Sequence, residues 1–213
     1  MRDDAGERLI VEINNAPLEP VNMNSSTPKL APPGAGLPKP ELWIARLLFA
    51  ISRRRTNREE ATAEFEKVRD QILKLVRTCD AETGSRRVLI KRPHGLEDSS
   101  RFWSVFMTLD HLRITNDAFT SVIQSLTTGV VPEFRASTAA VKPSEDVGIE
   151  TVSAFEDSCR RFVDHVSTAP DLHTALRYAH PWFGPLDAAA WHLLGGFHMS
   201  LHRNQIELIL RGL

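Results

Sequence analysis

Apolar residues recur at the spacing of an α-helix in four long segments, and this periodicity limits the possible folds more than any other feature of the chain. Each segment has one apolar face, which a folded chain buries against another element. No segment alternates apolar and polar residues as a convincing sheet strand would, and no internal repeat is present. The pattern therefore predicts an all-α fold, a four-helix bundle. The predicted helices cover residues 58–79, 99 or 100 to 129, 149–166 and 188–209, with Ser99 or Ser100 as the N-cap of the second and Asp187 as that of the fourth.

The chain before residue 40 has a different composition. Seven of the thirteen prolines lie between Pro17 and Pro40, mixed with Asn, Ser and Gly, and such a segment sustains neither helix nor strand ladder. We therefore predict a proline-rich arm or linker over residues 1–39, dispensable for metal binding, and a bundle domain over residues 40–213. The same patterns predict a short amphipathic helix over residues 42–51 and an extended, β-prone connection over residues 86–93.

The charge balance gives no sign of a nucleic-acid partner. The formal net charge is −1, and the densest basic run, Ser52 to Arg58, is typical of a solvated helix end. The two cysteines, Cys79 and Cys159, form no disulfide framework and suit a reducing compartment. The first residues lack the apolar core of a signal peptide, and residues 42–51 are too few to span a bilayer. We expect a cytoplasmic protein that binds neither nucleic acid nor a membrane.

Two histidines four residues apart, His198 and His202, lie on the apolar face of the last predicted helix. This spacing alone is a weak signal, but an unpaired polar group there costs roughly 1–3 kcal/mol. A third histidine, His111, lies on the apolar face of the second helix. One divalent ion would satisfy all three imidazoles and leave positions open for water or substrate, so we predict a metal site. His192, about 120° around the helix from His198, is predicted to lie on the surface.

Several other catalytic patterns are absent from the sequence. Met199 stands where an HExxH metalloprotease has Glu, and no histidine has Glu three residues before it, as di-iron bundles require. Glycine-rich phosphate loops and nucleophile elbows are missing, and Cys79 and Cys159 fit core packing. The adjacent Gly195 and Gly196 leave two interpretations open. Gly195 provides space beside the metal, or it allows tight contact with a neighbouring helix.

Two short motifs resemble those of the DinB-like superfamily. One is the mid-helix histidine within Thr108–Leu112, and the other is the histidine pair followed by Gln205. The run that begins at His180 is similar to a branch with an HPxFG turn before the ligand helix, and the resemblance covers about residues 58–212. It implies a four-helix bundle whose three histidines surround a divalent ion, often nickel or zinc, and frequently a homodimer. Characterised relatives include metal-dependent transferases and isomerases that use thiols such as bacillithiol, mycothiol or glutathione.

The metal-ligand role carries over to His111, His198 and His202 alone. Zinc or nickel is favoured, and imidazoles also accept iron, cobalt or manganese. The expected function is that of a metal-dependent thiol transferase or isomerase, in which the ion lowers the pKa of a low-molecular-weight thiol and the thiolate attacks a small electrophilic substrate.

Three further residues are candidates for supporting roles. Gln205, one turn beyond His202, is a candidate hydrogen-bond partner of a ligand, and Asp110 or His180 could orient one. For Asp110, a plain position at the helix flank is the stronger interpretation. Two other functions stay open: a non-catalytic, stress-related metal-binding module, and a metal-free helical interaction protein. Three histidines leave a coordination position open, unlike structural zinc sites with four protein ligands, and this favours an enzyme.

Overall fold

The computed structural model describes residues 28–213 and leaves residues 1–27 outside the described part. Long helices dominate it, and its strands are only two or three residues long. In chain order the elements are α1 (Lys39–Arg53), α2 (Arg58–Val76), α3 (Ala81–Ser85), β1 (Val88–Leu89), a 3₁₀ turn (Asp98–Ser100), β2 (Phe102–Trp103), α4 (Val105–Thr127), α5 (Glu150–Thr168), β3 (Tyr178–His180), β4 (Gly184–Leu186) and α6 (Ala188–Arg211).

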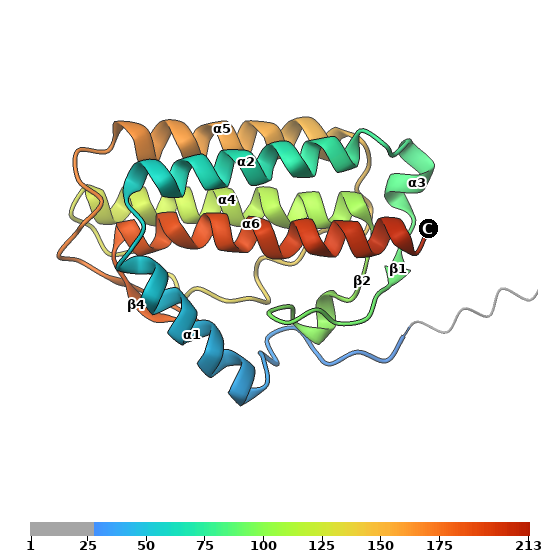
Figure 1. Ribbon diagram of the computed structural model, residues 1–213, viewed down its shortest axis with the longest axis horizontal. Helices are drawn as coiled ribbons and strands as arrows, with labels where there is room; N and C mark the ends of the chain where they lie inside the picture. The colour runs from blue at the N-terminus through green and yellow to red at the C-terminus, as the bar shows by residue number, and fades with distance from the viewer. Residues whose placement is uncertain (1–27) are drawn as a thin grey trace, which may run out of the picture.

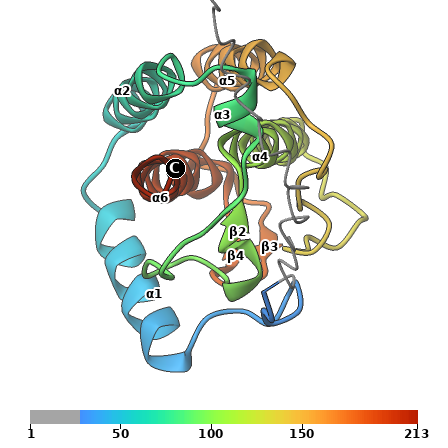
Figure 2. The same cartoon turned by 90° about the vertical axis from the view of Figure 1, so that its right-hand side faces the viewer.

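Four helices, α2, α4, α5 and α6, lie side by side as a bundle (Figure 1). Seen end-on they form a square in which α6 lies between α2 and α4, with α5 at the opposite corner (Figure 2). The core between them contains large, fully buried side chains, among them Phe65, Phe106, Phe155 and Phe162. The predicted four-helix bundle is confirmed. No helix within residues 28–213 is long and apolar enough to cross a bilayer.

The start of α4 differs from the prediction. Neither Ser99 nor Ser100 caps this helix, because residues 102–103 pair with β1 as strand β2 and so interrupt the chain before it. The N-cap is Ser104, whose hydroxyl oxygen accepts a hydrogen bond from the N–H of Met107 at 3.1 Å. The sequence predicts a polar cap here, but the strand pairing that selects which serine provides it is not visible in a local pattern.

Two other helix ends can be compared with the prediction. The helix predicted over residues 58–79 ends at Val76, and the separate short helix α3 follows with Asp80 as its N-cap. Asp187 is confirmed as the N-cap of α6, since its carboxylate accepts a hydrogen bond from the N–H of Ala190 at 2.9 Å. The chain thus enters α6 at the predicted residue, which sets the register of the histidines that follow.

Two small antiparallel hairpins stand beside the bundle. The first pairs β1 with β2, and β1 lies in the segment predicted to be extended. The second pairs β3 with β4 around a tight turn. Gly184, the first residue of β4, has a φ of 72°, a conformation that residues with a Cβ rarely adopt. This second hairpin places His180 next to α6.

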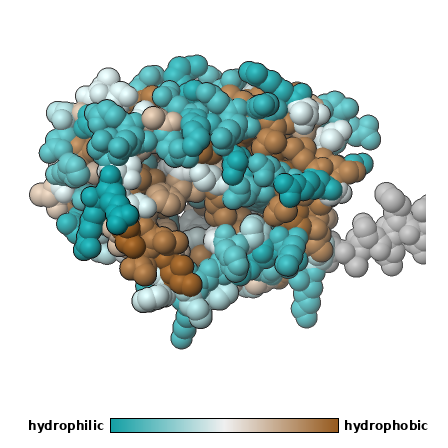
Figure 3. Space-filling model, in the orientation of Figure 1, coloured by the Kyte–Doolittle hydropathy of each residue, from teal (hydrophilic) through white to brown (hydrophobic). Residues whose placement is uncertain are grey.

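Helix α1 lies outside the bundle and turns its more apolar face to solvent. Phe49 packs against Phe183 and Phe197, with ring centroids 4.8 and 5.8 Å apart, and so attaches α1 to the rest of the chain. The opposite face carries hydrophobic side chains that form an exposed patch (Figure 3). Apolar patches of this kind mark interaction surfaces. The exposed side chains, which we call the outward face of α1, are Trp43, Ile44, Leu47, Leu48 and Ile51.

The described end of the predicted arm, residues 28–38, is attached to the segment before β2. The N–H of Ala31 donates to the carboxylate of Asp98 at 2.8 Å, and those of Gly34 and Gly36 donate to the buried carboxylate of Glu97 at 3.4 and 3.3 Å. The boundary at residue 39 and the dispensability of residues 1–39 stay predictions, and residues 1–27 lie outside the described part.

The space beside Gly195 is filled. A Cβ atom on Gly195 would lie 2.8 Å from Cζ of Phe162, whose buried ring stacks on Phe65 at a centroid distance of 4.5 Å. The interpretation that this glycine opens room beside the histidines is therefore wrong. Its alternative, tight contact, holds in the form of a side-chain ring from α5 packed against α6. Gly196 is less constrained, because a Cβ there would approach only the backbone nitrogen of Phe65, at 3.9 Å.

Gly195→Ala should be less stable than Gly196→Ala. Alanine gains about 1 kcal/mol over glycine inside a helix at either position. At Gly195 the ring of Phe162 must also move, and overpacking of this kind costs about 1–3 kcal/mol. We expect urea unfolding to show a free energy of unfolding about 1–3 kcal/mol lower for Gly195→Ala than for its neighbour. Equal stability of the two variants would show that Phe162 does not constrain α6.

Candidate metal centre

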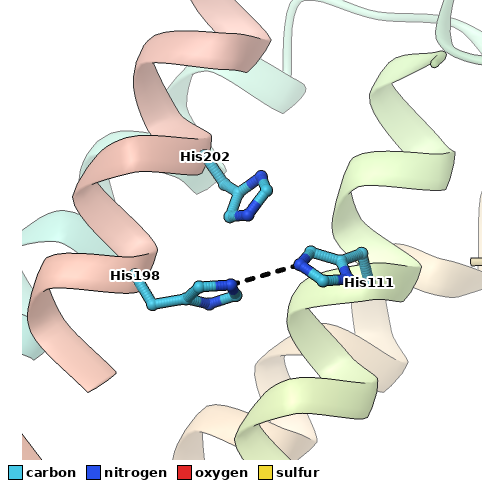
Figure 4. A group of neighbouring side chains, drawn as sticks. All are labelled: His111, His198 and His202. Atoms are coloured by element: carbon cyan, nitrogen blue, oxygen red, sulfur yellow. Dashed lines mark hydrogen bonds between the residues drawn. The ribbon is translucent and has the colours of Figure 1, made fainter. Parts of the chain in front are cut away.

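Three imidazoles meet between α4 and α6. His111 lies on α4. His198 and His202 lie one turn apart on α6, and their rings point toward the ring of His111 (Figure 4). One nitrogen of each ring lies within 4.8 Å of the other two, and the Nε2 atoms of His111 and His198 are 3.2 Å apart. The structure thus brings together all three histidines that the sequence suggested as metal ligands.

The positions of the protons on two rings follow from the groups behind them. Nδ1 of His111 lies 2.6 Å from the carbonyl oxygen of Val141, and Nδ1 of His202 lies 2.7 Å from Oε1 of Gln205. Gln205 is held in this orientation because its amide nitrogen donates to the carbonyl oxygen of Ser100 at 2.7 Å. Both oxygens only accept hydrogen bonds, so each Nδ1 carries the proton and each Nε2 is left with a lone pair.

His198 has a weaker partner behind it. Its Nδ1 lies 3.4 Å from the hydroxyl oxygen of Thr115, and that hydroxyl donates to backbone carbonyls of α4, those of His111 and Leu112, at 2.9 and 3.0 Å. With its hydrogen engaged, Thr115 accepts from Nδ1, which leaves a lone pair on Nε2 of His198 as well. A proton placed between the two Nε2 atoms of His111 and His198 would still leave Nε2 of His202 without a partner in residues 28–213. One shared cation would satisfy all three nitrogens.

Burial keeps the three rings neutral. Desolvation lowers the pKa of His111 to about 4, and it lowers the pKa values of His198 and His202 well below 6.5, with the neighbouring histidines adding to the effect. The indole of Trp103 lies nearly parallel to the His202 ring, with centroids 6.1 Å apart. Neutral imidazole is the form that binds metal, so these rings need lose no proton at neutral pH.

Asp110 is buried but engaged elsewhere. Its carboxylate accepts hydrogen bonds from the guanidinium of Arg113 at 2.8 and 3.0 Å and from the N–H of Ser144 at 3.1 Å. Within residues 28–213 it makes no hydrogen bond to the three imidazoles. Asp110 therefore holds the loop that contains Val141 against α4, and it influences the three histidines only through the position of that loop.

His180 lies at the edge of the same site. Its Nδ1 accepts hydrogen bonds from the N–H groups of Trp182 and Phe183 at 3.1 and 3.4 Å, and burial lowers its pKa to about 4. The ring packs against Trp191 with a centroid distance of 5.3 Å. His180 is therefore a neutral ring with its proton on Nε2, opposite in tautomer to the three central histidines.

His192 is buried, so its predicted surface position is wrong. It is 1% exposed, and its Nε2 lies 3.1 Å from the hydroxyl of Thr62 on α2. The reason is that α6 packs against α2 as well as α4, so more than one of its faces is covered. Burial lowers the pKa of His192 to about 4. This histidine shares a helix with two members of the cluster yet lies outside it.

A cavity of about 330 Å³ reaches the three histidines. At one end Lys142 lies 3.3 Å from the carboxylate of Glu97 and also donates to the hydroxyls of Ser99 and Ser100. The remainder is mainly apolar, and its size matches small-molecule sites in proteins. Residues that line the apolar part include Ile114, Ala118, Phe119, Val122, Phe134 and Trp191.

Three residues of the site are not among those predicted from the sequence. Thr115 had a usable signal, because it is a polar residue one turn after His111 on the same apolar face. Val141 contributes a backbone carbonyl, which no side-chain pattern reveals. Lys142 joins the site through its pairing with Glu97, a contact between segments 45 residues apart.

Comparisons with known proteins agree with this architecture. Residues 64–206, more than half of the chain, match the sequence model of the DinB superfamily. No curated protein matches the chain. Among solved structures the chain is similar to TT2238, described as a four-helix bundle protein, at 22% sequence identity and a TM-score of 0.51. That alignment covers 71% of this chain and 98% of the other, and at this identity it supports the fold alone.

Proposed function

Because the chain belongs to the DinB superfamily, we propose that it holds a divalent metal ion and acts as a metal-dependent thiol transferase or isomerase. One observation carries the proposal. The ligand nitrogens of His111, His198 and His202 lie within 4.8 Å of one another, and each ring has an acceptor behind its Nδ1. Metal-binding histidines are oriented in this way, by donating the other ring N–H to an oxygen.

The donor set fits a divalent ion of the first transition series. Imidazoles favour zinc or nickel here, and also accept iron, cobalt or manganese, so metal availability selects among them. When bound, such an ion acts as a Lewis acid that lowers the pKa of a thiol. The three histidines would bind the ion, while Val141 and Gln205 fix the orientation of two of them, His111 and His202.

The open cavity favours an enzyme over a non-catalytic, stress-related metal-binding module. A structural zinc site is closed by a fourth protein ligand. Within residues 28–213 no fourth histidine, cysteine or carboxylate joins the cluster, and the cavity gives a small molecule access to the histidines. The substrates that we propose are a low-molecular-weight thiol and a small electrophile.

We also propose a homodimer in the cytoplasm. The outward face of α1 is a surface on which a second copy could bury apolar side chains, because a twofold axis pairs one patch with its own copy. Both cysteines are free, and Cys159 is buried, which suits a reducing compartment.

The purified, untagged protein should contain about one divalent ion per chain. His111→Ala, His198→Ala and His202→Ala should each lower the metal content, because each removes a ligand. His192→Gln is the matched control: it also replaces a buried histidine of α6, but one outside the cluster, and should keep its metal. Elemental analysis by mass spectrometry measures the wild type, these four variants and a variant that lacks all three histidines. Equal metal content in the wild type and in the variant lacking all three histidines would refute the metal site.

Cobalt substitution should show a thiol bound to the ion. Sulfur ligation adds an intense near-ultraviolet charge-transfer band, which we expect with at least one of glutathione, bacillithiol and mycothiol. The S-methyl analogue, which forms no thiolate, should give no band. Binding should strengthen as the pH rises toward the free thiol pKa of about 8.5. If none of these thiols changes the spectrum of the cobalt-loaded protein at any pH, the proposed transferase activity is contradicted. The non-catalytic metal-binding module is then the better assignment.

A further inference from the structure

Beyond the three histidines, the cavity extends into an apolar part. Phe119 and Val122 of α4 line this part, together with Trp191 of α6 and with Phe134 of the loop between α4 and α5. The whole cavity measures about 330 Å³. An apolar cavity of about 150 Å³ holds benzene, so the whole cavity has room for about two aromatic rings.

One hydrogen-bond donor belongs to this part of the cavity. The N–H groups of Trp182 and Phe183 both donate to Nδ1 of His180, so the single proton of the neutral ring is on Nε2. The ring is fixed by packing against Phe183 and Trp191, with centroids 5.1 and 5.3 Å away. Within residues 28–213 its Nε2–H has no hydrogen-bond acceptor, and the ring lines the cavity.

The charged groups around the cavity are paired or exposed. The ammonium of Lys142 donates to Glu97, Ser99 and Ser100, which uses all three of its N–H groups. Arg135 lines the cavity but is exposed to solvent. The described chain therefore offers a charged ligand no buried counter-charge in the apolar part to offset its lost hydration, whereas an uncharged acceptor would pair with His180.

We propose that this part of the cavity binds an uncharged compound of one or two rings that carries a carbonyl, nitro or similar acceptor, and that His180 donates its Nε2 proton to that acceptor. The inference rests on the proposed function in one respect, that this compound is the electrophilic substrate. His180 then selects the substrate and holds it beside the three histidines, in place of the ligand-orienting role considered from the sequence.

Two probes of similar shape test the selection. 2-Acetylnaphthalene has a carbonyl acceptor, and 2-isopropylnaphthalene lacks one; equilibrium dialysis against the full-length, as-purified protein gives a Kd for each. The ratio of the two affinities isolates the hydrogen bond from apolar burial. We expect the preference for the ketone to fall about two- to tenfold when the Nε2–H is removed, the factor that one net hydrogen bond supplies.

Two variants of His180 distinguish the role of its Nε2 from that of its Nδ1. His180→Asn keeps an acceptor near the position of Nδ1 for the turn but has no donor at Nε2, so it should lose the ketone preference. His180→Gln places an amide N–H near Nε2 and should keep the preference, although it loses the turn acceptor. Ala118→Trp fills the cavity and should abolish binding of both probes, which shows that they bind there rather than on the outward face of α1.

The wild type binding neither probe, or His180→Asn keeping the ketone preference, would overturn the inference. Metal content measured on the same samples keeps this result apart from that of the proposed function. A metal-free wild type that still prefers the ketone through His180 contradicts the metal site and supports the cavity assignment. A fully loaded wild type without this preference supports the metal site and overturns the role of His180.

Discussion

The site depends on one constraint: three imidazole rings are held so that the lone pairs of their nitrogens face the same small volume. Two Nε2 atoms 3.2 Å apart repel each other unless a proton or a cation lies between them, so other contacts must hold the rings in place. Those contacts lie behind the rings, at Val141, Thr115 and Gln205. The packing of α4 against α6 provides the separation, and Gly195 leaves room beside α6 for the ring of Phe162 from α5.

The loop between α4 and α5 is the least regular part of the site and is held at several points. Asp110 binds the N–H of Ser144, Glu97 binds Lys142 and Thr138, and the hydroxyl of Tyr178 donates to the carbonyl of Phe134. Glu97 also receives the N–H groups of the segment before α1. One buried carboxylate thus joins the start of the described chain, the cavity wall and the segment before β2. Contacts of this kind give an irregular loop the order that a binding site needs.

Much of this architecture follows from periodicity, and the parts that do not have physical reasons. The apolar faces predicted the bundle, and the registers of His111, His198 and His202 placed them on those faces, because helical spacing is a local property. The position of His192 was wrong because burial depends on how many neighbours a helix has, which periodicity does not report. The start of α4 after Ser104 depends on the pairing between β1 and β2, and the exposure of the outward face of α1 depends on tertiary packing. Both are contacts between segments distant in sequence, which a local pattern does not report. Val141 contributes through its backbone, which carries no side-chain signal at all.

X-ray absorption at the K-edge of the bound metal tests the central claim most directly, because it reports the ligands themselves. We expect the wild type and His192→Gln to show imidazole nitrogens at about 2.0–2.1 Å, the distance of zinc–histidine bonds, together with the multiple-scattering pattern of the rings. His111→Ala should show that pattern reduced by about one ring of three. A metal surrounded by oxygen alone, with no imidazole scattering, would contradict the account.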